Sequence, residues 1–139
     1  MGKVTVDLTV TNHIDQILAE RGFIEADQIR SMTLTDVLVD TGASRLCLPA
    51  DVIGQLGLPL EGEVDARIAV GVQSLRVFKE VNLAACGREG TFNCVELPEG
   101  ELPLLGLIPL EDLGLQPDLQ NQQIKVLPQT GKDTYLMVL

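Results

Sequence analysis

The chain has 139 residues, of which 45% are hydrophobic and only 3% aromatic, so it can form one domain with a core of Val, Leu and Ile. Twenty acidic against ten basic side chains give a net charge of −10 and a pI near 4.4, which disfavours binding to nucleic acid and to anionic membranes. We therefore expect a single domain over residues 1–139 with neither of these partners.

Targeting and cysteine content suggest a cytoplasmic protein. The chain starts without the apolar segment of a secretion signal, and its longest apolar run, Leu104–Ile108, is too short to cross a bilayer. Cys47, Cys86 and Cys94 have no repeated spacing, as is usual in a reducing compartment. Cys86, Cys94 and His13 offer an alternative zinc site, but they lack a close Cys-x-x-Cys spacing. We expect three buried thiols, with no metal and no cofactor.

The first elements are predicted from periodicity. Apolar and polar residues alternate from Val4 to Thr11, which predicts a strand that is buried on one face. Ile14 to Gly22 has weak helical spacing and predicts a helical turn or an ordered loop that ends at a glycine. Residues 31–39 predict one or two strands that lead into Asp40.

A short helix is predicted after this point. Leu46 to Leu48 indicate a returning strand, and residues 50–56 indicate a helix, with Pro49 tolerated in its first turn. Gly57 is placed to cap the end of that helix.

The rest of the chain is typical of short strands. Glu63 to Val70 and Val72 to Phe78 predict a hairpin around Gly71, where unusual dihedral angles are needed. Further strands are predicted at Val81–Cys86, Thr91–Leu97, Gln123–Leu127 and Tyr135–Leu139. About eight strands with one or two short helices predict a mainly β, barrel-like fold.

Two motifs indicate chemistry. Residues 37–44, Val-Leu-Val-Asp-Thr-Gly-Ala-Ser, place the carboxylate of Asp40 at the end of an apolar strand and before a turn. Residues 103–113 supply an apolar pair, a glycine and a segment with helical character. Together, over about residues 4–128, these motifs resemble a retropepsin-type aspartic protease, and most closely the small single-domain bacterial aspartyl proteases.

The resemblance implies a closed acid-protease-type β barrel that acts as a homodimer on a peptide or protein substrate. One copy is too short to carry both aspartates, so the catalytic pair would be Asp40 from each of two identical chains. Two carboxylates close together cannot both ionise easily, so they share a proton. One then activates a water while the other polarises the peptide carbonyl. The implied activity is that of an aspartic endopeptidase.

The resemblance also gives roles to residues around Asp40. Thr41 would hydrogen-bond across the twofold axis to the second loop. Gly42 would adopt dihedral angles that a side chain forbids and would bring amides near the carboxylate. Ala43 replaces the serine that steadies the ionised acid in pepsin-like enzymes, which implies activity closer to neutral pH.

Two further segments complete the implied site. Leu104, Leu105 and Gly106 would support the active loop from beside it. Ala69, Val70 and Gly71 form the tip of the implied flap over the substrate, where many bacterial relatives have Ala-Asp-Gly, so substrate preference is expected to differ. Leu107 stands where viral members carry an arginine.

Other interpretations remain open at this stage. The Asp-Thr-Gly segment alone could be an ordinary turn, and its likeness to the phosphate loop of actin-like ATPases conflicts with the short chain. The fold could also serve as a dimeric module that binds peptides or assembles without hydrolysis. The apolar terminal segment Tyr135–Leu139 could either contribute to dimerisation or close its own barrel.

Overall fold

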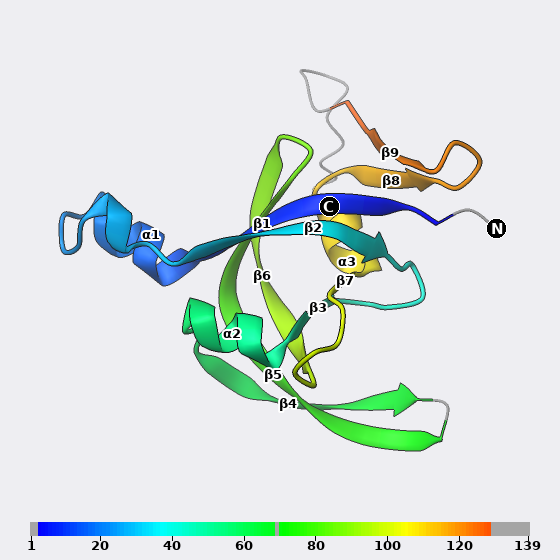
Figure 1. Ribbon diagram of the computed structural model, residues 1–139, viewed down its shortest axis with the longest axis horizontal. Helices are drawn as coiled ribbons and strands as arrows, with labels where there is room; N and C mark the ends of the chain where they lie inside the picture. Colours follow the sequence, from blue (N-terminus) through cyan, green and yellow to red (C-terminus); the bar gives the residue numbers. More distant parts are fainter. Residues whose placement is uncertain (1–2, 69, 129–139) are drawn as a thin grey trace, which may run out of the picture.

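A computed structural model describes residues 3–68 and 70–128, which form nine strands, three α-helices and one 3₁₀-helix (Figure 1). In chain order these are β1 (Thr5–Asn12), α1 (His13–Glu20), η1 (Ala26–Gln28), β2 (Ser31–Val39), β3 (Leu46–Pro49), α2 (Ala50–Leu56), β4 (Leu60–Ile68), β5 (Gly71–Ala85), β6 (Arg88–Leu97), β7 (Leu104–Leu105), α3 (Leu107–Asp112), β8 (Leu115–Asp118) and β9 (Gln123–Val126). The prediction of a mainly β fold is confirmed. The expected one or two helices were too few, because residues 13–20 form a full helix rather than a single turn.

Seven strands form one mixed sheet in the order β1-β2-β7-β3-β6-β5-β4. An additional pairing between β1 and β5 joins six of these strands into a ring. The pairs β2–β7 and β3–β6 are parallel, whereas the other pairs in the ring are antiparallel. Aliphatic side chains from the ring strands and from α2 and α3 fill the core, including Leu8, Val10, Leu46, Leu48, Leu56, Leu83, Leu105 and Leu110. The ring therefore encloses the aliphatic core that the composition predicts.

The end of β1 carries polar residues that start α1. Asn12 is buried; its side-chain oxygen accepts a hydrogen bond from the Asp15 amide at 3.0 Å, and its Nδ2 donates to the Leu56 carbonyl at 2.8 Å. The buried Asp15 carboxylate binds the Arg30 guanidinium through Nε at 2.8 Å and Nη2 at 3.0 Å. This hydrogen-bonded cation holds the pKa of Asp15 below its usual value. These polar contacts hold the segment that contains α1 against the ring of strands.

β2 is one strand, although the sequence left open one or two. Asp36 has a φ of 53° and the pairing with β1 shifts register at this point. The carboxylate of Asp7 accepts the Asp36 amide hydrogen at 3.0 Å, so the irregularity keeps its backbone donor satisfied. The strand then continues to Val39, so Asp40 lies directly after the end of β2.

The helix α2 follows the predicted limits. Pro49 is the residue before the helix rather than a member of its first turn, which corrects the expectation in detail. Gly57 ends the helix with a φ of 63°, the left-handed conformation that glycine adopts without strain. The helix buries Val52, Ile53 and Leu56 against the core.

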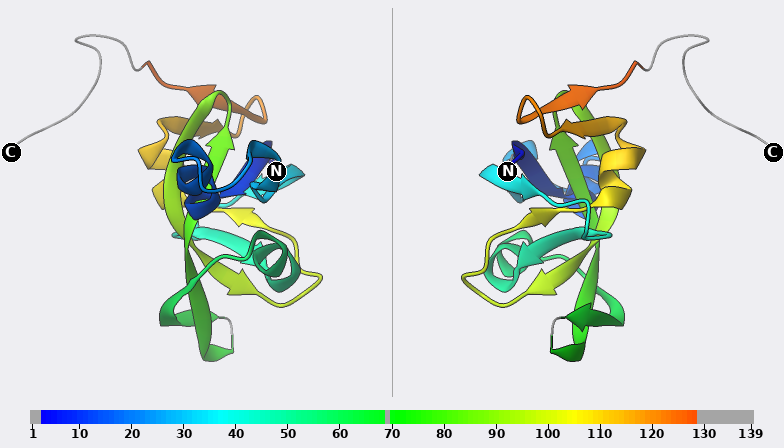
Figure 2. Two further views of the ribbon diagram at one scale, coloured as in Figure 1. Left: turned by 90° about the vertical axis from the view of Figure 1, so that its left-hand side faces the viewer. Right: turned by 90° about the vertical axis from the view of Figure 1, so that its right-hand side faces the viewer.

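The long strand β5 replaces two predicted strands. Residues 72–78 and 81–86 were expected to be separate, but β5 runs from Gly71 to Ala85 without a break. Glu80 has a φ of 65°, and the register with β6 shifts between Phe78 and Val81. The interruption is a β-bulge, because β6 pairs with β5 both before Phe78 and after Val81. The first half of β5 forms the hairpin with β4 that projects away from the ring (Figures 1 and 2).

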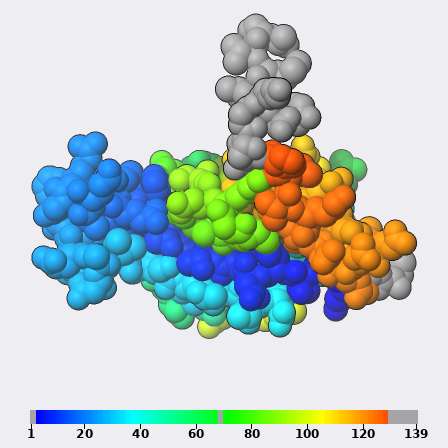
Figure 3. All heavy atoms as spheres, turned by 90° about the horizontal axis from the view of Figure 1, so that it is seen from above, coloured from blue at the N-terminus to red at the C-terminus, as the bar shows by residue number. Residues whose placement is uncertain are grey.

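The hairpin of β8 and β9 lies on the opposite side of the ring from the β4–β5 hairpin (Figure 1). β8 was not predicted, whereas β9 confirms the strand expected near residue 123. Arg88, at the turn between β5 and β6, donates to the carbonyls of Leu113 and Gly114 at 2.9 and 3.1 Å and to that of Leu127. Figure 3 shows this turn beside the orange β8–β9 hairpin. One arginine thereby ties the hairpin to the ring.

The predicted strand Tyr135–Leu139 lies outside the described residues. In the described part of the chain, no helix has the length and apolar character needed to span a membrane.

Candidate active site

The loop after β2 holds Asp40 in a tight turn. The amide of Asp40 donates to the Leu105 carbonyl at 3.0 Å, and the amide of Ala43 donates to the Asp40 carbonyl at 3.1 Å. The Gly42 amide donates to Asp40 Oδ1 at 2.9 Å. Backbone hydrogen bonds therefore fix the main chain of Asp40 and also orient its carboxylate.

The second motif lies directly beside this loop. β7 is inserted between β2 and β3, with Leu38 opposite Leu104, Val39 opposite Leu105, and Leu104 opposite Cys47. Leu105 is fully buried and Leu104 is half-buried. Residues about 65 positions apart in sequence are thus brought together by strand pairing, as the two motifs led us to expect.

Gly106 packs against the backbone of the active loop. A Cβ atom at this position would lie 2.4 Å from the Arg45 carbonyl oxygen, 2.6 Å from the Arg45 nitrogen and 2.8 Å from the Ala43 carbonyl oxygen. These atoms belong to the main chain and cannot rotate away. Only glycine lets the segment approach this closely.

The helix α3 holds the far half of the loop. The amide of Leu107 donates to the Ala43 carbonyl at 2.8 Å, and that of Ile108 donates to the Ser44 carbonyl at 2.9 Å. Both donors belong to the first turn of α3, which has no intrahelical partners for them. The first amides of α3 and the carbonyls of the loop therefore satisfy each other's hydrogen-bonding capacity.

Gly42 is needed for a different reason from the one expected. Its φ lies outside the left-handed region, so the loop does not rely on forbidden dihedral angles there. A Cβ on Gly42 would instead lie 3.1 Å from Asp40 Oδ1, on the carboxylate that its amide binds. Glycine thus provides space for the acid. Of the amides expected near the carboxylate, that of Gly42 binds it.

The acid affects its surroundings electrostatically. Asp40 is half-buried, whereas Thr41 and Gly42 are exposed. Burial, and then the negative charge of Asp40, raise the pKa of the Cys47 thiol on β3. Cys47 is therefore neutral near the carboxylate and adds no second charge to it.

The tip of the β4–β5 hairpin is apolar and open to solvent. Val70 is 91% exposed and Val72 is 64% exposed, and Gly71 has a φ of 131°. The need for glycine at this turn, inferred from the sequence, is confirmed. Ala69 lies outside the described residues.

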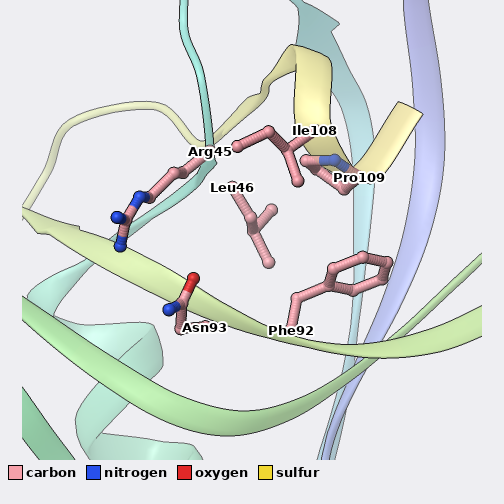
Figure 4. A pocket seen from close by; sticks show the side chains of 6 residues that line it. All are labelled: Arg45, Leu46, Phe92, Asn93, Ile108 and Pro109. Atoms are coloured by element: carbon pink, nitrogen blue, oxygen red, sulfur yellow. The ribbon is translucent and has the colours of Figure 1, made fainter. Parts of the chain in front are cut away.

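A pocket next to the active loop was not predicted. It is lined by Arg45 and Leu46 at the start of β3, Phe92 and Asn93 of β6, and Ile108 and Pro109 of α3 (Figure 4). Its members come from three separate parts of the chain, so no local pattern reveals it. Only the position of Arg45 shortly after Asp40 could have drawn attention to it.

The alternative zinc site is not assembled. Among residues 3–68 and 70–128, no three His, Cys, Asp or Glu side chains come close enough to hold a metal ion. His13 Nδ1 lies 3.0 Å from Gln16 Oε1, and Cys86 is exposed while Cys94 is buried. Of the three thiols expected to be buried, only Cys94 is fully so.

No protein-family model matches this chain, and no curated protein matches it either.

Proposed function

We propose that this chain is a homodimeric aspartic endopeptidase of the retropepsin type, with Asp40 of two identical copies as its catalytic pair. The observation that carries the proposal is the hydrogen-bonded junction between the Asp-Thr-Gly loop and the Leu-Leu-Gly segment, which fixes Asp40 at the end of β2. An ordinary surface turn needs no such support from a segment that lies far away in the sequence. The ring of six strands agrees with the acid-protease-type barrel that we propose for the fold.

A second copy is part of the proposal because the loop from Asp40 to Arg45 contains a single carboxylate. Peptide hydrolysis by this chemistry needs two groups, one to take a proton from water and one to polarise the carbonyl. Thr41 and Gly42 are exposed on the loop, so they are free to meet the same residues of another copy. A twofold axis beside the loop would place the two Asp40 carboxylates together.

Each Asp40 has a defined task in this mechanism. The pair shares one proton, because the second charge is unfavourable next to the first. The ionised member removes a proton from water, and the protonated member donates to the carbonyl oxygen as the tetrahedral intermediate forms. Gly42 orients the carboxylate through its amide hydrogen bond to Oδ1, so no rotation is needed before proton transfer.

The β4–β5 hairpin would act as the flap. Its tip exposes Val70 and Val72, which suits contact with an apolar substrate or with the tip of the partner's hairpin. Closure of an apolar hairpin over the carboxylates would also exclude bulk water.

Peptide cleavage with purified full-length protein tests the proposal. Mass spectrometry of a mixed peptide library should reveal products with the unaltered protein and none with Asp40→Asn. Asp27→Asn is a matched control, because Asp27 lies exposed in η1, which precedes β2, whereas the loop follows the other end of that strand. Its activity should equal that of the unaltered protein.

Oligomeric state gives the second part of the test. Analytical ultracentrifugation should show a dimer, and specific activity should fall when dilution dissociates it. A protein that stays monomeric at every concentration, or an Asp40→Asn variant that still cleaves, contradicts the proposal. Peptide binding by the dimer without cleavage would instead support the binding-module alternative.

A further inference from the structure

The pocket beside the active loop has the form of a small binding site. Its volume is about 260 Å³, and its walls come from the start of β3, the middle of β6 and the first turns of α3. Figure 4 shows the side chains of Arg45 and Asn93 on one side, those of Phe92, Ile108 and Pro109 on the other, and that of Leu46 between them. The pocket therefore has a polar end and an apolar wall.

Arg45 provides a positive charge at the polar end. Three other arginines are engaged: Arg30 with Asp15, Arg76 with Glu96, and Arg88 with backbone carbonyls. Arg45 as a residue is partly buried, and within residues 3–68 and 70–128 its guanidinium forms neither a hydrogen bond nor an ion pair. Acidic residues outnumber basic ones twofold, yet no carboxylate in that part of the chain pairs with Arg45. The guanidinium is thus left available for an anion from outside.

Asn93 provides an acceptor next to this cation. Its Nδ2 donates to Glu61 Oε2 at 3.1 Å, which fixes the orientation of the amide group. The amide oxygen then faces the pocket (Figure 4). A ligand that carries a carboxylate and a nearby N–H group would satisfy both side chains.

The apolar wall of the pocket favours a ligand with a hydrocarbon portion. Leu46 and Pro109 are buried beneath the pocket surface, Phe92 is half-buried, and Ile108 is exposed at its rim. A peptide can supply a carboxylate for Arg45, an N–H group for Asn93 and a hydrocarbon portion for the apolar wall. Its acidic side chain or carboxyl terminus lies within a few bonds of a backbone N–H and of neighbouring methylene groups.

We propose that this pocket binds a carboxylate of a peptide substrate, with Arg45 as the residue that determines specificity. Arg45 belongs to the loop that begins at Asp40, and α3 is hydrogen-bonded to the same loop through Leu107 and Ile108. A carboxylate held by Arg45 would therefore lie at a fixed number of residues from the bond that is cleaved. This consequence for cleavage rests on the proposed peptidase function, whereas binding in the pocket does not.

Peptides that differ by one charge test the inference. We would scan a single Glu through an otherwise neutral decapeptide, with Gln at the same position as the matched peptide. Free and amidated carboxyl termini form a second pair, which separates a side-chain carboxylate from a terminal one. At one position, or at the terminus, we expect kcat/KM to be about tenfold higher for the charged form, the effect of one charged hydrogen bond.

Variants of the protein assign the effect to the pocket. Arg45→Gln should remove the preference, and Arg45→Glu should reverse it in favour of Lys at the same peptide position. Arg21→Gln is the matched control, because Arg21 is exposed at the end of α1, away from the loop. It should keep the full preference. Circular dichroism melts would confirm that every variant is folded.

A binding readout separates this inference from the peptidase proposal. Calorimetry with the Asp40→Asn variant should show tighter binding of the acidic peptide, and this gain should vanish when Arg45→Gln is added. Arg45-dependent binding, together with no cleavage by the unaltered protein, would support the pocket and refute the peptidase. Cleavage with equal rates for charged and neutral peptides, or no difference in their binding, would overturn the pocket inference.

Discussion

Substitution of Gly106 by alanine tests the junction that fixes the candidate site. The added methyl group would lie 2.4 to 2.8 Å from three main-chain atoms of residues Ala43 and Arg45, well inside contact distance. To relieve this overlap, β7 and α3 must move away from the loop. Three backbone hydrogen bonds join these parts: Asp40 to Leu105, Leu107 to Ala43 and Ile108 to Ser44.

The expected cost follows from those contacts. Loss of the three hydrogen bonds at about 1 kcal/mol each gives about 3 kcal/mol of destabilisation. Overpacking in a well-filled region costs a similar amount, about 1 to 3 kcal/mol. We therefore expect Gly106→Ala to lower the free energy of unfolding by about 3 kcal/mol and to lower kcat, because Asp40 moves with the loop.

Gly54→Ala is the matched control. Gly54 lies in α2, and a Cβ there would have no atom within 4 Å. Alanine is the better helix former, so this variant should be more stable by up to about 1 kcal/mol. The same substitution thus changes stability in opposite directions at two glycines.

Urea denaturation followed by circular dichroism measures both variants, since the chain has no tryptophan to report unfolding. Protein concentration is held constant because dimerisation would contribute to stability. A Gly106→Ala variant within about 0.5 kcal/mol of the unaltered protein would refute the close packing of this segment on the loop.

Two further predictions concern titratable groups. Because Arg30 holds the pKa of Asp15 below 3.8, the stabilisation by this carboxylate is full above that pH and is lost as pH falls through the lower folded-state value. Asp15→Asn should therefore be less stable by about 2 kcal/mol at neutral pH, with a difference that shrinks in acid; a urea-denaturation difference that stays constant with pH would contradict this. Burial raises the pKa of Cys94 to about 12, so mass spectrometry after iodoacetamide treatment of the native protein should find the exposed Cys86 alkylated and Cys94 intact. Equal labelling of both thiols would show that Cys94 is not buried as described.

Local patterns predicted the elements whose limits depend on nearby residues. The alternation in β1 follows from the burial of Leu8 and Val10 on one face of the strand. The limits of α2 follow from Pro49, which lacks an amide hydrogen, and from Gly57, which takes a left-handed conformation. These signals are properties of single residues, so they can be read without knowledge of the fold.

Pairing between distant strands decided what the local patterns missed. β5 continues through Glu80 because β6 pairs with it on both sides of that residue, and β8 contains Pro117 yet pairs with β9. No short-range signal predicts either outcome, since the stabilising hydrogen bonds come from segments that are remote in sequence.

For the candidate site, the sequence by itself supplied the acid, its turn and the Leu-Leu-Gly segment. Only the tertiary structure decided that Gly106 touches the loop backbone, that Gly42 makes room for the carboxylate, and that Arg45 and Asn93 line the same pocket. The amino-acid sequence determines which chemical groups the site contains. The distances between these groups are set only when strands β2, β3, β6 and β7 pair around a shared core.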